Sequence, residues 1–287
     1  MLHTSTRRLG AAVAATALSA GALVAVSAPA ANAGMATNNY LCVNAVAGTI
    51  PVNVVTDVTL PPTAPAGFDV PADLLDVKNK VTIPNQAKAL FTQFGVTKVD
   101  MTDFKLTLGE GAVGAGSLAV APAAFVDNGN GTSTADINGK NAAFATPAAG
   151  TYVVSAPVSY ALIATLGNGS NAEFVCTNTA APTSVGTVAV AANESTTKAK
   201  PAKQPTPLGK KTKLKVVVDA DNEVPSGKVK VKKGKKVVGK GSLNAKGKVT
   251  ITLKKKLPKG KTVVKVLYSG DDYTESSRDK KVVIKVK

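Results

Sequence analysis

The chain has 287 residues, of which 44% are hydrophobic, and it carries 35 Lys and Arg against 18 Asp and Glu, a formal net charge of +17. This apolar content excludes a globally disordered chain, and the length accommodates about two domains of ~100–200 residues each. The one histidine is His3 and there is no tryptophan, which excludes most histidine-based triads, metal sites and general bases from the rest of the chain.

The charge is distributed unevenly along the chain. Residues 198–287 hold 27 of the basic residues and seven of the acidic ones, a net of +20, whereas residues 1–197 hold eight basic and 11 acidic residues. Such asymmetry between the two halves favours contact with a polyanion or a charged surface.

The first predicted element is an export segment. Arg7 and Arg8 precede an apolar stretch over residues 9–26, and Ala-Asn-Ala at residues 31–33 provides the small residues of a cleavage site. This order is typical of a secretory signal peptide. We therefore expect residues 1–33 to be a signal peptide, helical or disordered, and the mature protein to be secreted. No later stretch is long and apolar enough to predict a transmembrane segment.

Residues 34–179 form the first predicted domain, and their pattern is that of β-strands. Four stretches have the alternation or the β-forming residues of strands: residues 50–58, 98–108, 151–166 and 172–177. One short helix is predicted at residues 84–94, which begin with proline and are followed by Gly95. Strands at this spacing predict a β-sandwich.

Two cysteines lie near the ends of this domain in similar surroundings. Cys42 follows Tyr40 by two residues and Cys176 follows Phe174 by two residues, so each cysteine shares a strand face with an aromatic residue. An even number of cysteines in an oxidising compartment favours a disulfide, and we expect Cys42 to pair with Cys176. No Cys-x-x-Cys motif supports a redox-active thiol.

Candidate catalytic groups are few in the first domain. Asp69, Asp73 and Asp76 are close enough in sequence for acid–base chemistry, although a solvated loop is the favoured interpretation. Residues 127–131 (Asp-Asn-Gly-Asn-Gly) have glycine where a calcium loop needs oxygen ligands, so they predict a hairpin turn. We therefore expect no catalytic residue.

Residues 180–193 are mostly small and nearly uncharged, which predicts a linker.

Residues 194–287 then alternate apolar residues with lysines, as in Leu214, Val216 and Val218, a pattern typical of strands with one buried face. With residues 195–200 as the first strand, about seven strands are predicted, the size of an immunoglobulin-like sandwich. The predicted fold class is therefore all-β, with two β-sandwich domains.

Several motifs of the second domain match a known family. They are Pro225-Ser226-Gly227, the Gly239 and Gly241 pair, Leu257-Pro258-x-Gly260 and Tyr268-Ser269-Gly270-Asp271. Over about 194–287 the chain resembles the bacterial Ig-like repeat domain (group 3-like) of secreted and surface proteins. The resemblance implies a spacer, adhesive or binding module and transfers no catalytic residue. The first domain resembles N-terminal β-domains of unknown function in secreted actinobacterial proteins, through its signal peptide and its two cysteine contexts.

Most lysines of the second domain occupy outward strand positions. They are interpreted either as a solvated surface that prevents edge-to-edge aggregation or as a binding surface for polyanions, and both interpretations stay open. Lysine provides point charges, and Arg278 is the only arginine after Arg8, so sequence-specific nucleic-acid recognition is not expected. The candidate contacts to an anionic cell-wall polymer or other polyanion are Lys213, Lys215, Lys228, Lys230, Lys232, Lys254, Lys255 and Lys256.

The seven acidic residues of this domain fall in two loops that an Ig topology places at one end of the sandwich. Three interpretations are open: calcium binding, docking onto another copy, and compensation of the lysine charge, which is favoured. The candidate calcium ligands are Asp219, Asp221, Glu223, Asp271 and Asp272. No other cofactor is expected.

These observations predict a secreted, non-enzymatic module for binding or adhesion at the cell surface or in the extracellular matrix. Its basic Ig-like domain is expected to associate electrostatically with anionic wall polymers. Two alternatives remain: a structural spacer without a ligand, and a carboxylate-based enzyme in the first domain with the Ig-like domain as a wall tether.

Overall fold

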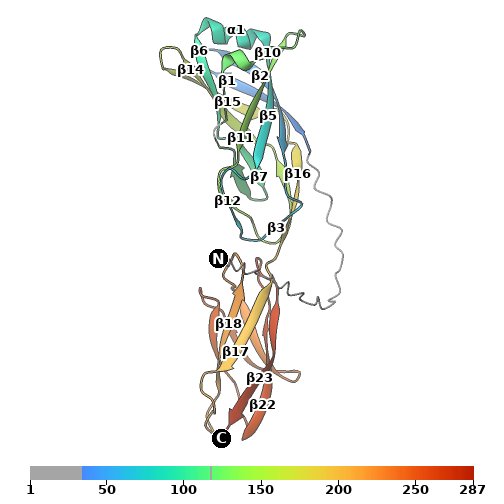
Figure 1. The fold of residues 1–287 in the computed structure, drawn as a ribbon, viewed down its shortest axis with the longest axis vertical. Helices are drawn as coiled ribbons and strands as arrows, with labels where there is room; N and C mark the ends of the chain where they lie inside the picture. Colours follow the sequence, from blue (N-terminus) through green and yellow to red (C-terminus); the bar gives the residue numbers. More distant parts are fainter. Residues whose placement is uncertain (1–33, 117) are drawn as a thin grey trace, which may run out of the picture.

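The computed structural model describes residues 34–116 and 118–287, and the signal peptide predicted at residues 1–33 lies outside these ranges. Figure 1 shows two β-domains stacked end to end along the long axis of the molecule. The predicted all-β fold class is confirmed, because strands make up most of the regular structure in both domains.

The first domain consists of two large sheets and one small one. The nine-stranded sheet has the order β10-β11-β5-β2-β1-β15-β14-β6-β9, and the five-stranded sheet has the order β3-β16-β13-β7-β8. Neighbouring strands are antiparallel, except that β3 and β16 are parallel. A two-stranded sheet, β12-β4, lies outside both.

The nine-stranded sheet contains β1 (Ala36–Asn44), β2 (Gly48–Val58), β5 (Asp76–Pro84), β6 (Val96–Thr102), β9 (Leu118–Val120), β10 (Val126–Asp127), β11 (Thr132–Lys140), β14 (Ser159–Leu166) and β15 (Asn171–Asn178). The other sheets contain β3 (Thr63–Pro65), β7 (Lys105–Leu108), β8 (Gly111–Gly114), β13 (Gly150–Ser155), β16 (Ser184–Ala191), β4 (Asp69–Val70) and β12 (Phe144–Ala145). Alternate residues of these strands face a shared apolar core, and the largest of these side chains include Tyr40 and Met101. Phe104, between β6 and β7, is buried in the same core.

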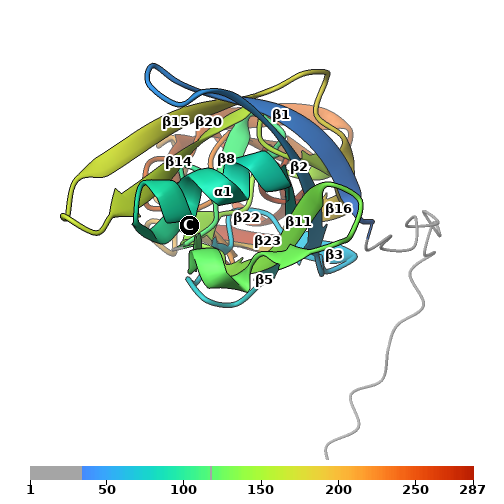
Figure 2. The ribbon, with the colours of Figure 1, turned by 90° about the horizontal axis from the view of Figure 1, so that it is seen from above.

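The predicted helix is confirmed as α1 (Asn85–Gln93), which follows Pro84 and ends before Gly95 at a φ of 60°. It covers the end of the first domain away from the second domain, as Figures 1 and 2 show. Phe91 of α1 packs against Phe125, which follows the short 3₁₀ helix η1 (Pro122–Ala124), with ring centroids 5.7 Å apart. Within the described residues, no helix has the length and hydropathy of a membrane span.

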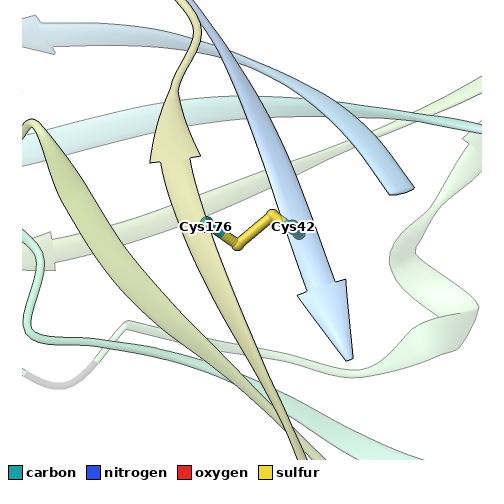
Figure 3. The surroundings of a disulfide bond; sticks show 2 residues. All are labelled: Cys42 and Cys176. Carbon is teal, nitrogen blue, oxygen red and sulfur yellow. A yellow bond between two sulfur atoms is a disulfide. The ribbon is translucent and has the colours of Figure 1, made fainter. Parts of the chain in front are cut away.

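The predicted disulfide is confirmed. Cys42 of β1 and Cys176 of β15 lie directly opposite each other in adjacent antiparallel strands, and their sulfur atoms are bonded (Figure 3). Both side chains are buried in the core. The bond closes a loop with a sequence separation of 134 residues, which restricts the unfolded chain much more than the folded one.

Three sequence expectations differ from the structure. The linker predicted over residues 180–193 contains β16, because Val185, Val188 and Val190 point into the core and pair the segment with β13. The strand expected over residues 98–108 is divided at Asp103, whose φ of 55° directs β6 and β7 into different sheets. The stretch at residues 151–166 is likewise divided into β13 and β14.

The second domain has the seven strands expected of an Ig-like sandwich. One sheet has the order β17-β18-β21 and the other has the order β20-β19-β22-β23. Their bounds are β17 (Ser195–Pro201), β18 (Lys213–Ala220), β19 (Lys228–Lys233), β20 (Lys236–Ser242), β21 (Lys248–Thr252), β22 (Gly260–Tyr268) and β23 (Ser277–Val286). A separate core fills the space between the sheets, with Leu214, Ile251 and Ile284 almost completely buried.

Two glycines explain how closely β20 approaches the opposite sheet. A Cβ on Gly239 would lie 2.7 Å from Ile251 Cγ2, and a Cβ on Gly241 would lie 2.8 Å from Val249 Cγ2. No side chain fits at either position without moving these neighbours. The Gly239 and Gly241 pair therefore has a packing role in the second domain.

Candidate functional site

The strongest candidate site is the lysine-covered surface of the second domain. Because strand residues alternate, burying Leu214, Val216 and Val218 of β18 directs Lys213 and Lys215 outward. The outer surface of the β17-β18-β21 sheet, called here the narrow face, carries Lys198, Lys200, Lys213, Lys215 and Lys248. Four of these lysines line a shallow groove of about 590 Å³, together with Asp219 and Asn244.

The other sheet carries a second set of outward lysines. Burial of Val229 and Val231 in β19, and of Val264 and Val266 in β22, directs the residues between them to solvent. The outer surface of the β20-β19-β22-β23 sheet, called here the wide face, carries Lys228, Lys230, Lys232, Lys240, Lys261, Lys265 and Lys285.

The strand register places lysines directly opposite one another. The narrow face has one such pair and the wide face has three: Lys200 and Lys215, Lys230 and Lys240, Lys232 and Lys265, and Lys261 and Lys285. A fifth pair, Lys233 and Lys236, stands at the turn that joins β19 to β20. Like charges at directly opposed positions destabilise a sheet. Among the described residues, the three ion pairs all lie in the first domain, so no carboxylate neutralises these lysines at ion-pair distance.

The eight lysines predicted to bind a polyanion do not form one patch. Lys213 and Lys215 lie on the narrow face, and Lys228, Lys230 and Lys232 lie on the wide face. The remaining three, Lys254, Lys255 and Lys256, are exposed between β21 and β22. Sequence reasoning missed the opposed partners such as Lys200, Lys240 and Lys265. The alternation of each strand indicates that these lysines point outward. It does not show which lysines of two different strands lie opposite each other.

The candidate calcium ligands are not assembled into a metal site. Asp271 accepts hydrogen bonds from the Ser226 backbone N at 2.6 Å, the Ser226 Oγ at 2.8 Å and the Tyr273 backbone N at 3.1 Å. Burial raises the pKa of the Asp271 carboxyl, but the hydrogen bonds from Ser226 and Tyr273 outweigh it and lower the pKa from its ordinary value. Within the described residues, no three acidic, histidine or cysteine side chains are grouped to hold a metal.

The expectation that all seven acidic residues lie in two loops is wrong for two of them, because Asp219 belongs to β18 and Asp279 to β23. The two acidic loops lie against the first domain. The Ala149 backbone N donates to the Asp272 carbonyl at 2.9 Å. Asn193 Nδ2 donates to the Ala66 carbonyl at 2.7 Å, while its Oδ1 accepts from Asn222 Nδ2 at 2.7 Å. We call these contacts the domain junction. It includes Asn193, which is buried, and it occupies the end of the sandwich where the acidic residues were expected.

The three carboxylates considered for acid–base chemistry in the first domain, Asp69, Asp73 and Asp76, are all exposed. Asp76 forms an ion pair with Lys140 at 3.0 Å, which holds the pKa of its carboxyl below the ordinary value. Asp69 lies in β4, and Asp73 has a φ of 65° in the loop that follows. Residues 127–131 form the expected hairpin turn between β10 and β11.

Comparisons with solved structures give little similarity. The fibronectin(III)-like modules of Clostridium thermocellum CbhA align with 80% of this chain and 94% of theirs, at 16% identity and a TM-score of 0.24. A Ruminococcus gnavus β-glucuronidase aligns with 88% of this chain and 43% of its own, at 11% identity and a TM-score of 0.26. Structural similarity this low says nothing about the function of the chain. A comparison with curated proteins gave no match.

Family models divide the chain in two. A bacterial Ig-like domain (group 3) matches residues 196–287, which agrees with the predicted resemblance of the second domain. A family of unknown function (DUF6801) matches residues 39–186, which is more than half of the chain. The protein therefore belongs to the DUF6801 family and carries a bacterial Ig-like domain (group 3) after the region that defines that family.

Proposed function

We propose that the protein is an exported, non-enzymatic binding module whose Ig-like domain attaches it to an anionic polymer of the cell surface. The observation that carries the proposal is the four opposed lysine pairs of the narrow and wide faces, which have no carboxylate at ion-pair distance among the described residues. Each pair costs stability in the free protein, and a bound polyanion would remove that cost.

Solubility and protection of sheet edges do not account for these lysines. A net charge of about 2–8 is enough to keep a small domain soluble, whereas residues 198–287 carry +20. Lysines that prevent aggregation are useful on edge strands. Lys215 and Lys230, however, lie on β18 and β19, which have a neighbouring strand on both sides.

The chemistry of the two faces favours a repeating anion without a base sequence. Lysines two positions apart on a strand are separated by about 6.6–6.8 Å along the chain, so a row of them offers regularly spaced point charges. Arg278 is the only arginine of the second domain, so bidentate recognition of base edges has little support. A phosphate- or carboxylate-bearing wall polymer fits this arrangement.

The non-enzymatic part of the proposal rests on the reactive groups that the chain possesses. Both cysteines form the disulfide, and the one histidine is His3. The remaining groups are hydroxyls, lysines and exposed carboxylates such as Asp69 and Asp73. Such carboxylates lack the burial that tunes a general acid or base.

Retention of the mature chain on immobilised polyphosphate tests the proposal. Binding should weaken steeply between about 50 and 200 mM salt, because each lysine–phosphate contact releases counterions. In the variant K230Q/K240Q, the slope of log affinity against log salt should decrease by about one for each lysine that contacts a phosphate.

The matched control is K78Q/K80Q, which removes the same charge from β5 of the first domain. It should bind like the unchanged protein. If the unchanged protein is not retained at low salt, or if the control loses as much affinity as K230Q/K240Q, the proposal is wrong.

A further inference from the structure

An apolar cavity of about 180 Å³ lies inside the first domain. Its walls come from both large sheets and include Val58, Val77, Leu108, Val113, Val154 and Val188. The segment of residues 60–75, called here the roof, covers the cavity. It contains only the short strands β3 and β4 and no long strand of either large sheet. The two sheets therefore enclose a space that the side chains of the core leave unfilled.

Two buried polar residues hold the roof in place. Asn141 Nδ2 donates to the Pro71 carbonyl at 2.9 Å, and its Oδ1 accepts from the Leu75 backbone N at 2.7 Å. Thr146 Oγ1 donates to the Pro65 carbonyl at 2.6 Å and accepts from the Phe68 backbone N at 2.8 Å. These side chains also line the cavity, but their hydrogen bonds are directed to the backbone of the roof.

The cavity is therefore suited to an apolar occupant. Water in a cavity needs about two to four polar partners, and a cavity lined by aliphatic and aromatic side chains stays dry. An engineered dry cavity of about 150 Å³ in another protein binds benzene or xenon. The present cavity is slightly larger at about 180 Å³, which matches a group of roughly six to eight carbon atoms.

Two exposed apolar side chains mark where the cavity meets solvent. Phe68 is 37% exposed and Leu74 is 58% exposed, and both belong to the roof and line the cavity. These two side chains provide apolar surface for a hydrocarbon group at the point of entry, next to the exposed carboxylates of Asp69 and Asp73.

We propose that this cavity binds one apolar group of about six to eight carbon atoms beneath the roof of residues 60–75. The source of the group is either a small free hydrocarbon or the end of an alkyl chain. In the second case, the polar head remains in solvent beside Phe68 and Leu74. This site is separate from the lysine faces, so it does not depend on the proposed attachment to a polyanion.

Methyl NMR of the full mature chain tests the site, with toluene and octanoate as separate probes. The methyl signals of Leu108, Val154 and Val188 should shift and saturate, while those of Leu214 and Ile251 in the second core should not. Saturation by toluene alone identifies a free hydrocarbon as the fitting ligand, and saturation by octanoate identifies a chain end. If neither probe shifts the cavity methyls up to its solubility limit, the proposal is wrong. It is also wrong if the methyls of the second core shift equally.

A filling variant gives the second test. Ala64 lines the cavity from β3, so A64F should occupy the space and weaken binding of either probe at least tenfold. The matched control is A89F on the exposed side of α1, which should leave binding unchanged. If A64F does not fold, xenon in crystals of the unchanged protein decides the question. One xenon atom among the cavity residues supports the site, and its absence there overturns the proposal.

Discussion

Two neighbouring tyrosines of the first core differ in how their hydroxyl groups are satisfied. The rings of Tyr40 and Tyr160 lie 4.8 Å apart and edge to face, and both side chains are buried. Tyr40 donates from its hydroxyl to the Pro157 carbonyl at 2.8 Å, whereas the Tyr160 hydroxyl has no partner in the described part of the chain. Burial raises the pKa of Tyr40 to about 12 and raises that of Tyr160 as well, so both hydroxyls stay protonated at neutral pH.

This difference predicts opposite effects for the same substitution. Y160F removes a buried hydroxyl without a partner and should raise the free energy of unfolding by about 1 kcal/mol. Y40F breaks a buried hydrogen bond and leaves the Pro157 carbonyl unpaired, so it should lower that free energy by about 1–3 kcal/mol. Urea denaturation of both variants provides the comparison. Equal effects of the two substitutions would show that the Tyr160 hydroxyl is satisfied in solution.

At the scale of single elements, each of several strands in the second domain has an inner face that stabilises the fold and an outer face that destabilises it. The inward-facing leucine and valines of β18, β19 and β22 are almost fully buried, which supplies the apolar contact that holds the sandwich together: Leu214, Val216, Val218, Val229, Val231, Val264 and Val266. Their outer positions carry lysines that face other lysines across the sheet. A strand selected only for stability would place opposite charges there.

The substitution K240E tests whether stability and binding are in conflict on the wide face. It places a carboxylate directly opposite Lys230, and it should raise the free energy of unfolding by about 0.2–1 kcal/mol. Retention on polyphosphate should decrease at the same time. Thermal or urea unfolding and the salt series together measure the two effects.

The control K246E makes the same charge change in the exposed turn before β21, where residue 246 belongs to no strand pair. It should lower retention without the gain in stability. A K240E variant that is more stable but retained as strongly as the unchanged protein would contradict a binding role for this face.

Local sequence patterns predicted most elements of the second domain, because each strand has one face in the core and one in water. The same alternation did not reveal that Lys230 faces Lys240 or that Lys261 faces Lys285, since register depends on how the strands pair. In the first domain, β16 was missed because its composition of small residues resembles that of a linker, and its burial comes from β13 and β3. The cavity and its roof were also not predictable. They depend on contacts such as Asn141 with Leu75 that span 66 positions.

At the scale of the whole molecule, the charge is divided between two bodies that meet at the domain junction. The acidic loops of the basic domain face the first domain, so the lysine faces are left on the sides of the sandwich. A Cβ on Gly67, which has a φ of 65°, would clash with Cγ of Glu223, so the two domains meet closely at this point. Asn193 hydrogen bonds to both sides of the contact.

Removal of the Asn193 side chain should loosen the junction. N193A leaves the Ala66 carbonyl and the Asn222 amide without their buried partner, at a cost of about 1–3 kcal/mol. Small-angle scattering should then show a broader range of interdomain distances. N53A, which removes an exposed amide hydrogen bonded to Asn39, should leave the scattering profile unchanged. An unchanged profile for N193A would mean that other contacts fix the domain arrangement.

The Cys42–Cys176 bond also determines how the protein responds to mechanical tension. If the second domain is held by a polymer and the other end of the chain is pulled, only the residues outside the crosslinked loop can lengthen. The loop spans 134 residues, so roughly 440–480 Å of chain cannot be extended while the disulfide is intact. Force would pass directly from β1 to β15 through the sulfur atoms. The first domain would therefore act as a short tether of nearly fixed length under oxidising conditions and as a long extensible one after reduction.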